Sequence, residues 1–151
     1  FKGKHMRSTI ARITVTAGVV LTMAGCAGMP RSTEHPLPVV QPDHGLVYFF
    51  RESSFKGAAI QYDIRDNGDV IGALQSGTYF FENATPGKHT YTAKTEAESD
   101  VTIDVSAGKT YYVQGTISMG FFAGHPHLKL ADEAEAQPAL SKLDYAVKSG
   151  K

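Results

Sequence analysis

The sequence of 151 residues has one cysteine, Cys26, and this excludes an internal disulfide framework. It also lacks acidic residues before Cys26. Four of its 15 basic residues precede that position, which leaves 11 basic against 15 acidic residues from Cys26 onward. A mildly acidic domain has no cluster of Lys and Arg with which to bind phosphates. We therefore exclude nucleic acid as a partner.

Motifs of the common enzyme classes are absent as well. The chain has no G-x-S-x-G, no phosphate-binding P-loop and no dinucleotide fingerprint. Carboxylates such as those of Asp63, Glu82 and Asp104 are scattered at strand spacing on outward faces, a pattern typical of solvated surfaces. We predict a non-enzymatic protein that requires no cofactor.

The N-terminal region has an apolar run too short to span a membrane. Ile13 to Gly25 is free of charge and covers about 13 residues, whereas a spanning helix needs about 20. The run follows a basic start at Met6 and ends in small residues, which is the plan of a secretory signal. We assign residues 1–25 to upstream residues and a cleaved signal peptide. Phe1 to His5 are interpreted as a misplaced start or an artificial extension.

Met23-Ala24-Gly25-Cys26 resembles the lipobox of bacterial lipoproteins, with Met23 where Leu is usual. The resemblance implies that a signal peptidase recognises Met23, Ala24 and Gly25, and that Cys26 is lipidated and becomes the first mature residue. Several acyl chains on one residue would anchor the protein stably. Ala27 follows in place of an Asp, which implies the outer membrane and its periplasmic face. The alternative is a secreted protein with a buried thiol.

Residues 26–44 carry four prolines, Pro30, Pro36, Pro38 and Pro42, between polar residues. Such a composition predicts an extended, semi-rigid tether rather than part of a core. Ala27 to His44, at roughly 3.1 Å per residue, could reach about 55 Å from a membrane surface.

Residues 45–131 show strand patterns throughout. Gly45 to Arg51 is a continuous apolar run, which predicts a central strand buried on both faces. Asp66-Asn67-Gly68-Asp69 predicts a hairpin with a type I′ turn, because that turn needs positive φ at both central residues. Further strands are predicted within residues 58–65, 70–74, 77–82, 89–95, 101–105, 110–119 and 128–130. The fold class is therefore all-β, an antiparallel β-sandwich of seven or eight strands.

Residues 132–151 form a tail rich in Ala, Glu, Leu and Lys. Leu140, Leu143 and Val147 fall at helical spacing, which favours a short amphipathic helix with Pro138 in its first turn. This helix either packs on the sandwich or frays.

The domain resembles the bacterial family DUF2846 over about Gly45 to Asp132. The resemblance rests on strands and turns: the aromatic opening strand with Arg51 after it, Asn67-Gly68, Gly77-Thr78-Tyr79-Phe80, Pro86-Gly87-Lys88-His89, Tyr111-Tyr112-Val113 and Met119-Gly120-Phe121. The Pro-Gly-Lys-His turn is also similar to PEGA-type surface modules, which are small β-sandwiches. The family implies an envelope lipoprotein without a defined activity, so it supplies no catalytic residues.

Gly120-Phe121-Phe122-Ala123-Gly124 places two adjacent aromatic residues between glycines. A bulge that folds both rings into the core is the interpretation that we favour. If Phe121 and Phe122 are exposed instead, they mark a contact with a partner or a membrane.

His125-Pro126-His127 places two imidazoles on one face of an extended segment, which is half of a zinc site. A third ligand, such as His89 or Asp132, would have to come from the fold. The simpler interpretation is an exposed loop that leads into the last strand, without a metal.

Three functional hypotheses follow. The first is a lipid-anchored periplasmic binding or adaptor module, which contacts an envelope protein or the cell wall through an open sheet edge or residues 120–124. The second is a periplasmic enzyme or metal-binding protein that uses His125 and His127. The third is a purely structural envelope lipoprotein.

Overall fold

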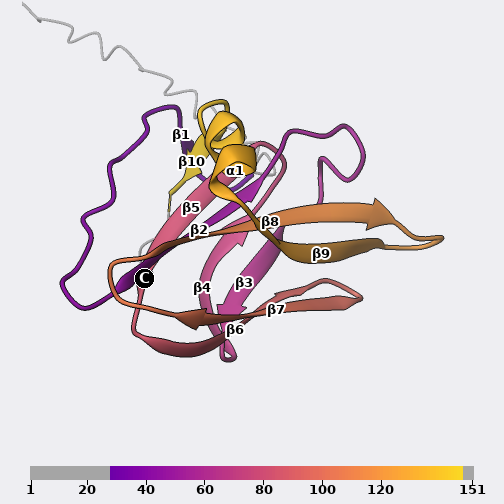
Figure 1. Ribbon diagram of the computed structural model, residues 1–151. Coiled ribbons are helices and arrows are strands. Elements are labelled where there is room, and N and C mark those ends of the chain that lie inside the picture. Colours follow the sequence, from indigo (N-terminus) through magenta and orange to yellow (C-terminus); the bar gives the residue numbers. More distant parts are fainter. Residues whose placement is uncertain (1–27, 148–151) are drawn as a thin grey trace, which may run out of the picture.

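The computed structural model describes residues 28–147, which form ten strands and one short helix (Figure 1). The strands are β1 (Arg31–Ser32), β2 (Gly45–Arg51), β3 (Tyr62–Asp66), β4 (Asp69–Leu74), β5 (Thr78–Ala84), β6 (Gly87–Lys94), β7 (Glu98–Val105), β8 (Thr110–Met119), β9 (Gly124–Ala131) and β10 (Asp144–Ala146). Helix α1 (Glu133–Leu140) lies between β9 and β10 in the chain.

The strands form two sheets, as expected for a sandwich. One has six strands in the order β1-β10-β5-β2-β8-β9, and the other has four in the order β4-β3-β6-β7. The all-β, two-sheet prediction is confirmed. Two details differ from it, because β2 pairs with β8 and β10 with β5 in parallel. Parallel partners cannot be joined by a tight hairpin, and β2 and β8 are separated in the chain by β5 and the whole four-stranded sheet.

Strand β2 is the centre of the core, as its apolar run predicts. Val47 and Phe49 face the second sheet and are fully buried, and the Phe49 ring stacks on Phe80 with 4.9 Å between centroids. Phe50, on the opposite face, is buried in a second cluster with Leu140 of α1. Burial of each such side chain contributes roughly 1.5–3 kcal/mol.

The β3–β4 hairpin has the predicted turn. Asn67 and Gly68 have φ of 48° and 101°, and Asp66 pairs with Asp69 across the turn. Asn67 also accepts a hydrogen bond at its side-chain oxygen from the Thr90 amide, 3.1 Å away. The turn is therefore tied to the neighbouring strand β6.

The C-terminal helix forms but is shorter than its leucine spacing suggests. The side chain of Asp132 caps it by accepting a hydrogen bond from the Glu135 amide at 2.8 Å. Because the helix begins at Glu133, Pro138 is its sixth residue and not in its first turn. Leu143 and Val147 lie beyond the helix, on either side of β10. The helix packs on the outer face of the six-stranded sheet rather than fraying (Figure 1).

Part of the proline-containing segment is attached to the sandwich. Arg31–Ser32 pairs with β10, and the His35 ring stacks on Tyr79 with 5.8 Å between centroids. Farther along, the Gln41 amide donates to the Asn83 side chain at 3.0 Å. The composition showed that the segment is extended, but its docking depends on distant strands.

One flank of the sandwich is closed and the other is open. On the closed flank, the Leu128 amide of β9 donates to Ser99 Oγ of β7 at 3.0 Å. On the open flank, β4 is an edge strand. Within residues 28–147, no helix is long and apolar enough to cross a membrane.

Candidate functional site

The predicted lipidation site lies outside the described residues. This applies to Cys26 and to the recognition residues Met23, Ala24 and Gly25, so all four stay predictions. The predicted residues that the structure does describe, Phe121, Phe122, His125 and His127, all lie at or near the tip of the β8–β9 hairpin.

Phe121 and Phe122 are exposed, so the favoured interpretation of two buried rings is wrong. Their side chains are 97% and 96% exposed. Their rings contact each other edge to face, with 5.3 Å between centroids. The reason is a tight turn, in which the Gly120 amide donates to the Ala123 carbonyl at 2.8 Å. Both phenylalanines are the central residues of this turn, where side chains point away from the strands.

A second loop packs against the base of this hairpin. The sequence patterns did not identify this loop as part of a candidate site. It spans residues 52–61 and carries Phe55, which is 99% exposed. A Cβ on Gly57 would lie 2.8 Å from Ile117 of β8, so loop and strand are in close contact. The signal in the sequence was a lone Phe beside Lys56 in a run of small residues.

Arg51 holds this loop in place. Its guanidinium is buried, with the residue 2% exposed. It donates to the carbonyls of Ile60 and Gly57 at 2.6 and 2.7 Å. The guanidinium also lies 5.6 Å from the ring centroid of Tyr62. Burial lowers the pKa of Arg51, and the nearby Tyr62 opposes this.

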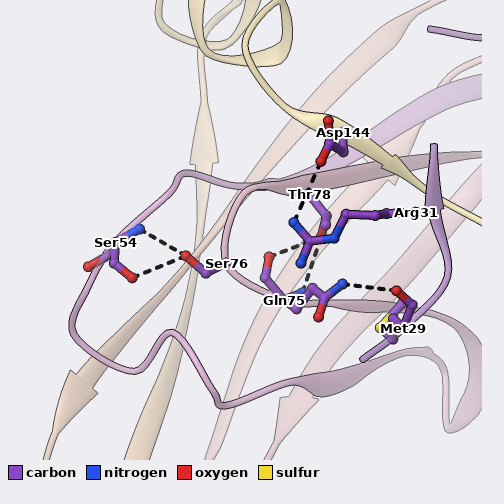
Figure 2. Close-up of polar contacts among 7 residues, drawn as sticks. All are labelled: Met29, Arg31, Ser54, Gln75, Ser76, Thr78 and Asp144. Atoms are coloured by element: carbon purple, nitrogen blue, oxygen red, sulfur yellow. Dashed lines mark hydrogen bonds and ion pairs between the residues drawn. The ribbon is translucent and has the colours of Figure 1, made fainter. Parts of the chain in front are cut away.

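Figure 2 shows how the start of the described chain is joined to the same loop. Ser76 Oγ accepts from the Ser54 amide at 2.9 Å and donates to the Ser54 carbonyl at 3.1 Å. The adjacent Gln75 donates from Nε2 to the Met29 carbonyl at 3.3 Å. Met29 therefore lies beside the β4–β5 turn, and this turn is bonded to the loop that carries Phe55.

The Arg31 side chain adds an ion pair at this junction. Its Nη1 lies 3.6 Å from the Asp144 carboxylate (Figure 2). Both side chains are partly exposed, so the pair contributes little free energy and serves chiefly to align β1 with β10.

The two histidines of β9 are exposed, and each has a neighbour within the hairpin. His127 Nε2 lies 2.8 Å from Ser118 Oγ across the β8–β9 pair. A Cβ on Gly120 would lie 2.7 Å from His125 Nε2. Among residues 28–147, no group of three or more His, Cys, Asp and Glu side chains is placed to hold a metal ion. The proposed third ligand His89 is bound elsewhere.

His89 belongs to a buried polar cluster that sequence reasoning did not identify. Its Nδ1 lies 2.6 Å from Asp66 Oδ2 and its Nε2 lies 2.7 Å from the Thr85 carbonyl. Both partners are acceptors, so both ring nitrogens donate and the imidazole is protonated. Burial lowers the pKa of His89, but the hydrogen bonds to Asp66 and Thr85 outweigh it and raise the pKa overall.

Tyr91 stacks on His89 within this cluster, with 5.8 Å between ring centroids. Burial raises the pKa of the Tyr91 phenol, and the carboxylates of Glu82 and Asp66 raise it further. Because its pKa is raised, the Tyr91 phenol keeps its proton near neutral pH, so no phenolate is present to act as a base. We interpret the cluster as a structural connection between the sheets.

The open flank carries a groove of about 720 Å³ between β4 and the β10 end of the other sheet. Its walls are mainly apolar, and include Met29, Ile71, Phe80 and Val147. The edge strand β4 forms one wall of this groove.

Comparison with known proteins gives a family but no activity. Residues 41–126, more than half of the chain, match the family described as "Protein of unknown function (DUF2846)". A protein of Haemophilus influenzae, described as "Uncharacterized protein", is 30% identical over 152 residues, covering 96% of this chain and 89% of that protein. No solved structure matches the chain. The chain therefore belongs to the DUF2846 family.

Proposed function

We propose that this chain is a membrane-anchored, non-enzymatic binding module of the bacterial cell envelope, attached through a lipidated Cys26. The observation that carries the proposal is the exposed Phe121–Phe122 pair at the tip of the β8–β9 hairpin. Two adjacent, fully exposed aromatic rings are unfavourable in water unless they are covered in use. The periplasmic face of the outer membrane is the proposed location, because Ala27 follows Cys26.

The anchor is tested by labelling cells with palmitate. We expect label on the wild-type chain and none on Cys26→Ala. Separation of inner and outer membranes then tests the location. An unlabelled wild-type chain would contradict the anchor.

The contact surface is tested by placing a photo-reactive amino acid at position 122 in the full chain in intact cells. We expect a discrete adduct, to protein or to lipid. Position 37 is the matched control, because Leu37 is also apolar and is 88% exposed. Equal background adducts at both positions would contradict a binding module and favour a purely structural lipoprotein.

The metal-binding alternative is distinguished by metal analysis of the purified protein. A stoichiometric metal that is lost on changing His125 and His127 to Ala would contradict the proposal. Ser118→Ala is the control, because it removes the neighbour of His127 without removing an imidazole.

A further inference from the structure

The proposed membrane anchor would leave the domain beside the β4–β5 turn. Cys26 precedes Gly28 by two residues, which span at most about 7 Å. Gly28 and Met29 both lie beside Gln75. Since β1 is already part of a sheet, the long tether expected from the prolines is not available, and a membrane attached at Cys26 lies close to this end of the sandwich.

The three exposed phenylalanines lie on loops at this end. The loop of residues 52–61 begins where β2 ends, and it is bonded through Ser54 to the β4–β5 turn beside Met29. The same loop packs on Ile117, at the base of the hairpin that carries Phe121 and Phe122. In Figure 1 the loop and the hairpin project from the sandwich on the same side. One end of the molecule therefore combines the emerging chain with three exposed rings.

The charges of these two loops suit a bilayer surface. Residues 53–61 and 115–131 contain no Asp or Glu, and they carry Lys56 and Lys129 together with His125 and His127. Among the acidic residues around this surface, Glu135 pairs with Lys129 at 2.9 Å, Glu52 accepts a hydrogen bond from Gln114, and Glu96 lies in the exposed β6–β7 turn. A cation next to an exposed aromatic ring, as Lys56 is next to Phe55, favours the interface of a membrane that contains anionic lipid.

From this arrangement we propose that the phospholipid bilayer is the partner of the loops, and that Phe55, Phe121 and Phe122 insert into its interface. The inference rests on the proposed function, whose unspecified partner it names. A bilayer accommodates separate convex tips, whereas a protein partner would need a matching pocket for each. Insertion would hold the domain in one orientation, with the Asn67-Gly68 hairpin directed away from the membrane (Figure 1).

The chain contains no tryptophan, so a single Trp reports its own environment without background. We would make Phe122→Trp and Phe55→Trp in the full chain, and Leu37→Trp as the control. All three positions are at least 88% exposed, so the substitutions leave the core unchanged. Leu37 lies in the segment that is bonded to Asn83. Asn83 pairs with Leu46 near the start of β2, whereas the loop of residues 52–61 follows the opposite end of that strand.

The variants are reconstituted into phosphatidylethanolamine–phosphatidylglycerol vesicles with or without brominated lipid. We expect blue-shifted emission and quenching by bromine at positions 122 and 55, several-fold stronger than at position 37. Adding Phe55→Ser and Phe121→Ser to the Phe122→Trp chain is expected to reduce quenching to the level of position 37.

Equal, solvent-like emission at positions 122 and 37 would overturn the proposal and leave a protein or the cell wall as the partner. Palmitate label on the same preparation reports the anchor separately. If the label is absent, the anchor fails, and the same variants are titrated with preformed vesicles. Quenching at position 122 above that at position 37 then still supports insertion, and its absence overturns it.

Discussion

His89 Nδ1 donates to Asp66 Oδ2 over 2.6 Å, between the ends of strands β6 and β3. The second ring nitrogen donates to Thr85, so the folded protein binds the protonated imidazole. The raised pKa of His89 in the folded state means that this stabilisation is fully present below the unfolded value of 6.5. It is lost as the pH rises through the folded value.

We therefore predict that the free energy of unfolding falls as the pH is raised from about 6 into the alkaline range. His89→Gln should remove this pH dependence and cost about 1–3 kcal/mol at pH 6, because the partly buried Asp66 carboxylate loses its charged partner. Urea denaturation between pH 5.5 and 9 measures both effects. His44→Gln is the control, since His44 lies in an exposed contact with Pro42. An unchanged slope in His89→Gln would show that other groups set the pH dependence.

Arg51 should be irreplaceable by lysine. An ammonium cannot reproduce the two diverging donors that reach Ile60 and Gly57, so one partly buried carbonyl loses its bond. We predict that Arg51→Lys lowers the free energy of unfolding by about 2–3 kcal/mol and speeds proteolysis within residues 52–61. Denaturation and limited proteolysis measure these effects. Arg65→Lys, whose guanidinium makes an exposed bond to Gly68, should change stability by less than about 0.5 kcal/mol.

Gly115 of β8 leaves room for the Tyr62 hydroxyl. A Cβ at this position would overlap Tyr62 Oη and lie 3.1 Å from Leu74 Cδ1. Gly115→Ala is therefore expected to destabilise the protein by about 1–3 kcal/mol through overpacking. Thermal unfolding followed by circular dichroism tests this. The matched control is Gly28→Ala, where the nearest atom is a side-chain oxygen 3.5 Å away. Equal melting temperatures for both variants would contradict the packing argument.

The exposed phenylalanines should matter for contact and not for folding. Changing Phe121 and Phe122 together to Ser should alter the free energy of unfolding by less than about 1 kcal/mol, because neither ring packs on the core. Phe49→Ala, at a fully buried position, should cost about 3–5 kcal/mol. Urea denaturation of the two variants tests the distinction. A large loss in the double Ser variant would mean that the hairpin tip is covered in the folded protein.

Local patterns were sufficient for most strands. Gly45 to Arg51 is a strand with the predicted bounds, because a short, aromatic-rich apolar run between turn residues is typical of a doubly buried strand. Asn67-Gly68 specified its turn because few residue pairs tolerate two positive φ values. The parallel pairing of β2 with β8 was not predictable, since it depends on how the five intervening strands fold back.

For the candidate site too, local sequence predicted some features and the tertiary structure decided the others. The sequence by itself determined that Phe121 and Phe122 stand between glycines, beside two histidines, and that the lone Cys26 follows a charge-free run. Whether those rings are buried depended on the Gly120–Ala123 turn, and the sequence alone favoured the wrong outcome. Only the tertiary structure brought Met29, Ser54 and Phe55 to one end of the sandwich. It also placed the His89 ring within hydrogen-bond distance of Asp66. These contacts join residues more than 20 positions apart, and such pairings follow from sheet register rather than from local sequence.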